Sequence, residues 1–495
     1  MRAKSAKAAL RNLATMSAPG ISFKYKPPVD RNMRTLDRSF FVSKVPLCVV
    51  RFPDPKNISI FSKKFKESIL RVPRIPHVVK LDQAEGSRRS DGKSLACDNG
   101  IVTKGVLLAD TISSIDEART RLSPDAMSFL DETEAEILPY EYKMDYDFWK
   151  AEEILRAVLP EQFLDEIPTG FTVVGHIAHL NLRQEFKPFA ALIGQVILDK
   201  NNKIETVVDK VSSIATQFRT FPMQVIAGRD SDLVVEQKES NCTFRFDFSK
   251  VYWNSRLHTE HERLVSQFFQ PGQVLCDVFA GVGPFAIPAA KKDVIVLAND
   301  LNPESFKYLR ENIELNKVSP LVEALNLDGG EFISKSFELL SQWRERTKGK
   351  ISVPLKLSHH ERKRQKKQPV QGIPATRELE IPLHINHFVM NLPDSSISFL
   401  DKFIGLYHNL HVQTMPHIHL HCFEKYGIDE EPTMEELHDR VHSRILSSLR
   451  TSEKILPKDR LSFHLVRKVS PTKPMFCVSF QLPKEVASAN PVYTT

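Results

Sequence analysis

The stretch VLCDVFAGVGPF, residues 274–285, decides how this chain folds. An apolar run ends at Asp277, passes through a turn that contains Gly281 and Gly283, and leaves through Pro284. Glycine allows a sharp turn and lets a ligand approach without a Cβ in the way. Proline suits the first turn of a helix, where its missing N–H would have no partner. The stretch therefore predicts a strand, a tight turn and a helix, the first unit of a nucleotide-binding α/β sheet.

The same residues bear on which nucleotide would bind. Gly281, Gly283 and Ala286 also match the relaxed dinucleotide fingerprint, which is a weak signal by itself. Two features favour S-adenosylmethionine, which has no phosphates. Pro284 removes a backbone donor where a pyrophosphate needs one, and the carboxylate of Asp277 would repel phosphate but attract an ammonium group. An ordinary strand-to-helix turn with a terminal aspartate is the plain alternative.

Further strands follow this unit. Residues 294–300 form a second apolar run, whose terminal Asp300 is well placed for ribose hydroxyls. Residues 322–328 end in Asp-Gly, and more strands are expected at 387–392, 417–423, 462–469 and 474–482, with a helix over 433–449. A final antiparallel pair is typical of methyltransferase sheets. The predicted fold is therefore α/β, with a Rossmann-like class I methyltransferase domain and two smaller N-terminal α/β domains.

Composition limits the choice of function. A chain of 495 residues should hold more than one domain, and a net charge of +7 permits a polyanionic partner without proving one. No apolar run is long enough to cross a bilayer. The cysteines are scattered without a CxxC pair, so we expect reduced thiols and neither a disulfide framework nor a zinc site: Cys48, Cys97, Cys242, Cys276, Cys422 and Cys477.

The N-terminal extension, residues 1–36, begins with 29 residues that include no acid. Basic, acid-poor starts resemble mitochondrial transit peptides, although a disordered basic tail is an equal alternative. Met16 could serve as a second start, which predicts a product in the mitochondrial matrix and another in the cytoplasm and nucleus.

The remaining domains are expected at residues 37–140, 141–250 and 251–485, with a tail at 486–495. The first has a flexible insertion at 82–100 and a basic segment that could meet phosphates, although a solvated face is the commoner explanation: Arg71, Arg74, His77 and Lys80. The second should contain a helix over 146–158, a strand over 170–182 and a hairpin over 232–249. The charged residues 344–380 are expected to be a disordered insertion.

Two polar motifs lie near the predicted carboxyl ends of strands. Asn391-Leu392-Pro393 directly follows the fourth strand and resembles the loop with which methyltransferases of planar nitrogens hold their target, although it is also a common turn. An Asn amide both donates and accepts, which suits a nucleobase. His417, His419 and His421 alternate on one strand face, but the sequence places no carboxylate or cysteine ligand with them on that face. We expect packed or hydrogen-bonded histidines and no metal.

Together, residues 277–285, 299–303, 390–393 and 256–260 (RLHTE) resemble the archaeal and eukaryotic tRNA (guanine-N1)-methyltransferases. That family methylates the guanosine just 3′ of the anticodon, tRNA position 37, which supports reading-frame maintenance. The resemblance runs from about residue 37 to about residue 482 outside the insertions, and is greatest to fungal members. It implies a small domain that senses the tRNA outer corner, a middle domain and a catalytic domain, together with a tRNA partner. The sequence itself gives no reason to expect a membrane partner or more than a monomer.

The resemblance also implies the site residues. Glu260 would be the general base, Arg219 would lie against guanine O6, and Asn391 with Pro393 would hold the target base. By spacing alone, Glu260 would be a helix-surface acid. His261 stands where archaeal relatives carry an arginine near the cofactor. The expected cofactor residues are His261, Asp277, Phe279, Gly281, Asp300, Leu301, Asp328, Gly329 and Asn391.

The chemistry asks for the same residue types. Guanine N1 must lose a proton before it attacks, and a carboxylate takes that proton best if burial raises its pKa towards neutrality. Negative charge then spreads to O6, where a fixed guanidinium stabilises the transition state. The base must also leave its stack to enter the pocket. Two alternatives remain: transfer of the aminocarboxypropyl group of the same cofactor to a tricyclic guanine derivative, and an RNA-binding protein without turnover.

Overall fold

The computed structural model describes residues 23–81, 103–211, 220, 222–230, 233–355, 376–408, 410, 412 and 414–490. The chain divides into two compact units. The first comprises Met1–Thr169 and Arg183–Asn202, and the second comprises Gly170–Leu182 and Lys203–Thr495. The domain boundaries expected near residues 140 and 250 stay predictions.

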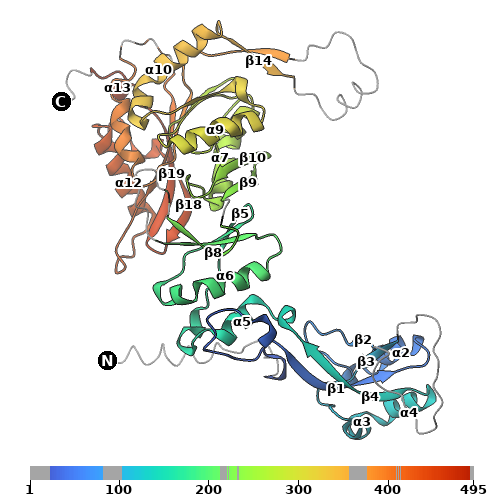
Figure 1. The fold of residues 1–495 in the computed structure, drawn as a ribbon. Helices are drawn as coiled ribbons and strands as arrows, with labels where there is room; N and C mark the ends of the chain where they lie inside the picture. Colours follow the sequence, from blue (N-terminus) through green and yellow to red (C-terminus); the bar gives the residue numbers. More distant parts are fainter. Residues whose placement is uncertain are drawn as a thin grey trace, which may run out of the picture. The chain divides into compact units, whose positions relative to one another are not determined.

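The first unit is built on an antiparallel sheet with the strand order β2-β3-β1-β4. Helices α2, α3 and α4 pack on one face of it, around a cluster of phenylalanine rings that includes Phe52, Phe61 and Phe129. The elements of this unit, coloured blue to cyan-green in Figure 1, are β1 (Ser43–Arg51), α2 (Lys56–Lys64), β2 (Val78–Lys80), β3 (Lys104–Leu107), α3 (Ile115–Arg121), α4 (Pro124–Glu132), β4 (Glu136–Met144), α5 (Ala151–Val158) and α6 (Ala190–Asp199).

The helix expected over residues 146–158 is interrupted. A 3-10 turn, Tyr146–Phe148, precedes α5, and Trp149 and Lys150 between them have extended backbones. Trp149 is buried and donates its indole N–H to the carbonyl of Tyr25, 3.3 Å away, which pulls the chain out of helical geometry. Tyr25 itself is buried, so the described part of the N-terminal extension belongs to the core of this unit.

The second unit starts with a four-stranded sheet of order β5-β6-β7-β8 and a two-stranded hairpin. The single strand expected over residues 170–182 is two strands, because Gly175 with φ 56° reverses the chain. The hairpin turns at Ser240 and Asn241, as expected. These strands are β5 (Thr172–Val174), β6 (Ile177–Leu180), β7 (Thr206–Lys210), β8 (Met223–Gly228), β9 (Val234–Glu239) and β10 (Cys242–Asp247).

The rest of this unit is a seven-stranded sheet of order β13-β12-β11-β16-β17-β19-β18. The first five strands are parallel, and β19 and β18 close the sheet antiparallel, which confirms the Rossmann-like class I methyltransferase fold expected from the sequence. The strands are β11 (Val274–Asp277), β12 (Ile295–Asn299), β13 (Val322–Leu325), β16 (His387–Met390), β17 (His417–Phe423), β18 (Ser462–Ser470) and β19 (Lys473–Gln481).

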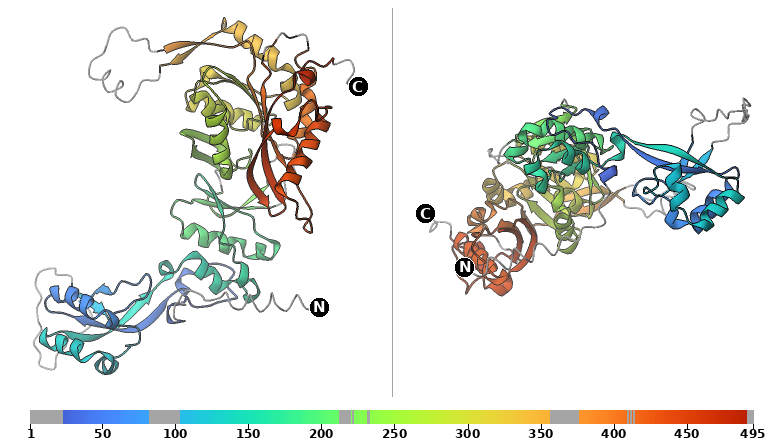
Figure 2. Two further views of the ribbon diagram at one scale, coloured as in Figure 1. Left: turned by 180° about the vertical axis from the view of Figure 1, so that it is seen from behind. Right: turned by 90° about the horizontal axis from the view of Figure 1, so that it is seen from below.

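Helices lie on both faces of this sheet, with α7 and α9 on one side and α12 on the other (Figures 1 and 2). The hairpin β9–β10 is bound to α9, because Asn312 and Asn316 accept hydrogen bonds from the backbone of β10. The helices of this unit are α7 (His258–Gln267), α8 (Ala286–Lys291), α9 (Pro303–Leu315), α10 (Gly329–Arg346), α12 (Met434–Ser448) and α13 (Lys484–Ala487).

Strand β11 lies between β12 and β16, so the strand order reverses there. In open α/β sheets, ligands bind at the carboxyl ends of the strands beside such a reversal. Asn299, at the end of β12, is fully buried and fixes this edge of the sheet. Its amide donates to the carbonyls of Val278 and Leu327 and accepts from the N–H of Leu327. One side chain therefore joins the loops that follow three neighbouring strands.

The charged insertion differs from the expectation of disorder over 344–380. Its ends pair as a hairpin of β14 (Lys350–Pro354) and β15 (Thr376–Glu380), while residues 356–375 lie outside the described part. Alternating burial of Ile351 and Val353 explains why these ends fold. The insertion at 82–100 also lies outside the described residues. Across the described ranges, no helix is both long and apolar enough to cross a membrane.

Candidate functional site

The turn after β11 has an open backbone. Gly281 has φ 55°, and a Cβ built there would meet nothing within 4 Å, so a ligand can approach this residue closely. No such space exists beside Gly283, because a Cβ built there would lie 2.7 Å from the side chain of Ile287. The N–H of Gly281 donates to Oδ2 of Asp300, 2.8 Å away. The structure thus joins the turn to the end of the second strand.

Two acidic side chains meet at this turn with different surroundings. Asp300 also accepts from the N–H of Asn302; burial raises its pKa to about 6, against the lowering effect of these backbone donors. Asp277 is fully buried, and neither of its oxygens has a hydrogen-bond partner, although the N–H groups of Phe279 and Ala286 point towards it. Burial, together with the charge of Asp300, raises the pKa of Asp277 to about 8.

Two more of the expected cofactor residues, Asp328 and Gly329, lie at the start of α10. Asp328 caps this helix, with Oδ1 accepting from the N–H of Gly330 at 2.8 Å. Gly329 lies against Phe279, whose ring would be 2.6 Å from a Cβ at that position, so only glycine fits there. Leu301 is partly exposed, and its carbonyl accepts from the amide of Asn326. These cofactor residues therefore share one edge of the sheet.

The Asn391 loop, residues 391–395, follows β16 and is held from inside. Ser396 donates to the carbonyl of Met390 and accepts from the N–H of Leu392, and the carbonyl of Pro393 accepts from the N–H of Phe423. Asn391 Oδ1 is buried and has no partner among the described residues. A buried, unpaired amide oxygen on a fixed loop is suited to a donor on a ligand.

Glu260 lies on α7 and its carboxylate is 2% exposed. Arg263 donates through Nε at 2.7 Å and through Nη2 at 2.9 Å, and His421 donates through Nε2 at 2.8 Å. The expectation that burial would raise the pKa of this base is wrong for the described state. Burial does act in that direction, but the hydrogen bonds from His421 and Arg263 outweigh it and hold the pKa of Glu260 well below its usual range.

His261, the next residue, belongs to a second buried pair. Its Nδ1 lies 2.6 Å from Oε1 of Glu239, at the end of β9. The ring of Phe285, which follows the glycine turn, lies edge-on to His261 at 4.7 Å and is tilted against His421 at 5.8 Å. Phe285 thus places both acid–imidazole pairs beside the turn after β11.

His419 and His421 are hydrogen-bonded, as expected. His419 contacts Ser479 through Nδ1 and His387 through Nε2, and His387 contacts the amide oxygen of Gln273. Because that oxygen also accepts from the N–H of Gln270, it fixes the direction of the whole chain of bonds. Each imidazole then donates through Nε2 and accepts through Nδ1, so both rings are neutral, and burial lowers the pKa of His387 to about 4.

Sequence reasoning gave no role in the site to Arg263, Glu239 and Ser396, and expected His421 only as a packed or hydrogen-bonded histidine. Only Arg263 carried a local signal, since its spacing of three residues from Glu260 on a helix allows an ion pair. Glu239 and His421 arrive from distant strands, and Ser396 follows the Asn391 loop without a motif of its own. Arg219 lies outside the described residues, so its position beside the target base stays a prediction.

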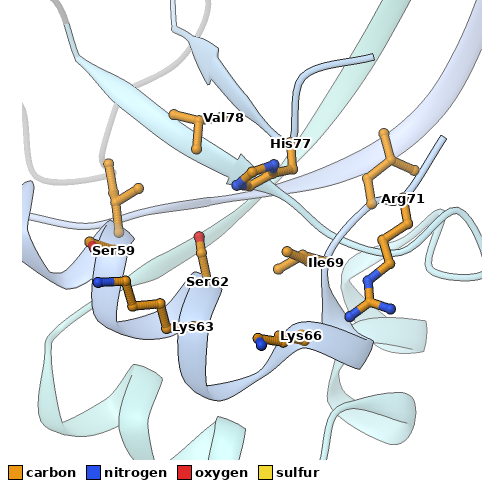
Figure 3. Close-up of a pocket in the computed structure, with 10 residues that line it drawn as sticks. Ser59, Ser62, Lys63, Lys66, Ile69, Arg71, His77 and Val78 are labelled. Atoms are coloured by element: carbon orange, nitrogen blue, oxygen red, sulfur yellow. The ribbon is translucent and has the colours of Figure 1, made fainter. Parts of the chain in front are cut away.

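A basic pocket lies in the first unit, between α2 and β2. Lys63, Lys66, Arg71 and His77 are among the residues that line it (Figure 3). Arg74 belongs to the basic segment that was expected to meet phosphates. Its guanidinium is instead paired with Glu153, and it donates to both carboxylate oxygens at 2.7 Å. The basic segment is thus only partly available to phosphates.

The edge of the sheet fits S-adenosylmethionine. Its cationic part matches the unpaired carboxylate of Asp277, the open backbone at Gly281 leaves room for it, and Asp300 and Asp328 offer acceptors for hydroxyl and amino groups.

Comparisons with known proteins agree with this geometry. Residues 235–339 match the TRM5/TYW2 methyltransferase domain, and residues 151–231 match the TYW2 N-terminal domain. The chain is 63% identical to a tRNA (guanine(37)-N(1))-methyltransferase of Saccharomyces cerevisiae over 94% of this chain and 95% of the relative. It is 50% identical to the enzyme of that name from Candida albicans, over 94% and 98%. A solved complex of aTrm5 and tRNALeu has a TM-score of 0.54 at 17% identity, over 88% of this chain and 99% of that one, and shows the same fold.

The buried carboxylate of Asp277 predicts a pH-dependent stability. Because its folded pKa is about 8, the folded protein keeps a proton that the unfolded chain releases above about pH 4. Wild-type stability is therefore lost as pH rises towards 8. We expect Asp277→Asn to gain stability relative to wild type by roughly 1 kcal/mol per pH unit between about pH 5 and 8. The free energy of unfolding of wild type and of Asp277→Asn, measured with denaturant at about pH 5 and about pH 8, tests this.

The exposed Asp394 provides a matched control. Asp394→Asn should differ from wild type by the same small amount at both pH values. An Asp277→Asn variant whose difference from wild type does not change with pH would show that this carboxyl is ionised in the folded protein.

Proposed function

Because the chain belongs to the family of tRNA (guanine(37)-N1)-methyltransferases, we propose that it methylates N1 of guanosine 37 in tRNA through Glu260 and Asn391. It is an S-adenosylmethionine-dependent enzyme, and its substrate is tRNA. The observation that carries this conclusion is 63% identity over 94% of the chain to a tRNA (guanine(37)-N(1))-methyltransferase.

The cofactor supplies a methyl group on a positively charged sulfur. The residues that would hold it are Asp277, Gly281, Asp300, Asp328 and Gly329, from loops that Asn299 joins. A cation beside Asp277 stabilises its charged form, so binding should be accompanied by loss of its proton near neutral pH. The chain aligns donor and acceptor, and alignment alone accounts for much of such a rate enhancement.

Glu260 would take the proton from guanine N1. In the described state its oxygens are occupied by Arg263 and His421, and so tightly held a carboxylate is a weak base. Arg263 must therefore move off one oxygen before the proton is transferred. His421 can stay, because its Nε2–H keeps the carboxylate oriented through one oxygen while the other is exposed to the substrate proton.

The target base would be held by the Asn391 loop. Asn391 Oδ1 lacks a partner and suits a donor on the guanine edge, and Pro393 gives the loop a rigid wall. His261, fixed by Glu239, would face the cofactor. Arg219 would stabilise the charge that develops on O6.

One observation supports the alternative reaction, the transfer of an aminocarboxypropyl group. The domain matches carry the name TYW2 beside TRM5. The close relatives at 63% and 50% identity are both methyltransferases, which favours methyl transfer. The mass of the product separates the two reactions.

The decisive test uses two transcripts of one tRNA, with guanosine or adenosine at position 37. We expect the protein to add a single methyl group to N1 of guanosine 37 and nothing to the adenosine transcript, because only guanine offers a protonated N1 to a base. Mass mapping of digested RNA measures both. A larger adduct would favour the alternative reaction, and cofactor and tRNA binding without product would favour an RNA-binding protein.

Glu260→Gln isolates the proton transfer. Glutamine fills the same volume and still accepts hydrogen bonds, but it cannot take a proton at neutral pH. We expect single-turnover methylation to slow by about 10²- to 10⁴-fold with little change in tRNA affinity.

The control is Glu262→Gln, because Glu262 is exposed on the same helix. It should behave as wild type. Normal single-turnover chemistry in Glu260→Gln, combined with a large loss of tRNA affinity, would contradict a proton-accepting role.

We also propose that the enzyme acts as a monomer, in mitochondria as well as in the cytoplasm and nucleus. The acid-free residues 1–29 and the second methionine, Met16, support two products. Sequencing of the mature N-termini from separated fractions tests this. A single N-terminus in all compartments would contradict dual targeting.

A further inference from the structure

Three side chains form a row across the antiparallel part of the large sheet. His421 on β17 and His464 on β18 are both direct partners of Cys477 on the strand between them, β19. Side chains at paired positions lie on the same face, and adjacent strands are about 4.8 Å apart. The thiol of Cys477 is therefore flanked by one imidazole on each side.

Glu260 comes from α7 and completes the group. One carboxylate oxygen lies 2.8 Å from Nε2 of His421, and the other lies 3.6 Å from Nε2 of His464. The ligand atoms of Glu260, His421 and Cys477 all lie within 4.8 Å of one another. The structure thus brings a carboxylate and a cysteine to the same face as His421, whereas Cys422, the next residue in sequence, points to the opposite face.

One thiolate, two imidazoles and a carboxylate are the ligand types that Zn²⁺ prefers, in the number that it prefers. We propose that Glu260, His421, His464 and Cys477 form a site for a thiophilic divalent cation such as Zn²⁺, and that its occupation blocks methyl transfer. The blocking rests on the proposed function, because it acts by removing Glu260 as a base. When the Zn–S bond forms, the thiol proton of Cys477 is released to solvent.

In the described state, the positive charge beside Glu260 is the guanidinium of Arg263. Its guanidinium neutralises Glu260 through two hydrogen bonds, and its side chain is 15% exposed. A guanidinium and a divalent metal cannot both bind this carboxylate closely, because like charges repel strongly at such distances. Metal entry therefore requires the guanidinium of Arg263 to leave Glu260.

Two features favour reversible binding over a permanent structural metal. Nδ1 of His421 is buried without a partner, whereas the second nitrogen of a structural ligand normally donates to a neighbour. His464 is 45% exposed on the edge strand β18, which provides a route from solvent. The site is thus suited to a regulatory or inhibitory cation that a chelator removes.

The test is a titration of the full chain with Co²⁺, which reports tetrahedral and thiolate coordination by its visible and near-ultraviolet absorption. We expect one equivalent to bind with a thiolate band, and Zn²⁺ to displace it. Cys477→Ser should abolish the thiolate band. His464→Ala, an exposed position that carries little risk to folding, should weaken Co²⁺ binding by about tenfold or more.

Cys422→Ser is the matched control, because Cys422 is the neighbour of His421 on β17 and points to the opposite face. It should keep the thiolate band. In parallel, single-turnover methylation is measured with Zn²⁺ and again after a chelator, relative to the metal-free rate of each variant. Inhibition should be reversible in wild type and require about tenfold more Zn²⁺ in His464→Ala.

Three results would overturn the proposal: absence of Co²⁺ binding, a thiolate band that survives in Cys477→Ser, or undiminished methylation by protein saturated with Zn²⁺. Co²⁺ binding at this site by a protein that fails to methylate guanosine 37 would leave the metal site standing while the proposed function fails.

Discussion

The position of β11 between β12 and β16 is the constraint on which the site depends. Because the strand order reverses there, the loops after these strands diverge and leave room at their carboxyl ends. That edge would be loose without Asn299, whose buried amide makes three hydrogen bonds to the loops on either side. The same edge carries Asp277, Asp300 and the Asn391 loop. Its shape therefore follows from backbone topology, and its rigidity from one buried side chain.

The sheet edge was predictable from sequence because each acid directly follows its own strand. Asp277 and Asp300 are such residues, and parallel strands bring their carboxyl ends together. The surroundings of Glu260 were not predictable in this way. Arg263 is near in sequence, but His421 is 161 residues away and belongs to a strand whose neighbours appear only in the folded sheet. The predicted direction of the pKa shift of Glu260 was wrong for this reason: the chemistry of a base led us to expect burial, but not the hydrogen-bond donors that outweigh it.

The interruptions in the N-terminal elements have a similar origin. Residues 146–158 have a helical pattern, yet burial of the Trp149 indole against Tyr25 extends the backbone before α5. A contact across 124 residues overrides a local preference there. Conversely, the hairpin at Ser240 and Asn241 follows from its turn residues alone, and it was placed correctly.

Asp277, at the end of β11, and Glu260, on α7, are both buried acidic residues, but their surroundings differ. Asp277 has no bonded donor, and its pKa is raised, so it is prepared to receive a cation and gains from doing so. Glu260 has a cation already in Arg263, and its proton affinity is correspondingly low. A carboxylate of the second kind becomes a base only when its cation leaves. In the proposed reaction a substrate proton, the guanidinium and the proposed metal ion would all compete for the same oxygens, so whatever draws Arg263 away would decide which of the others can bind. Control of methyl transfer would then be control over one arginine side chain.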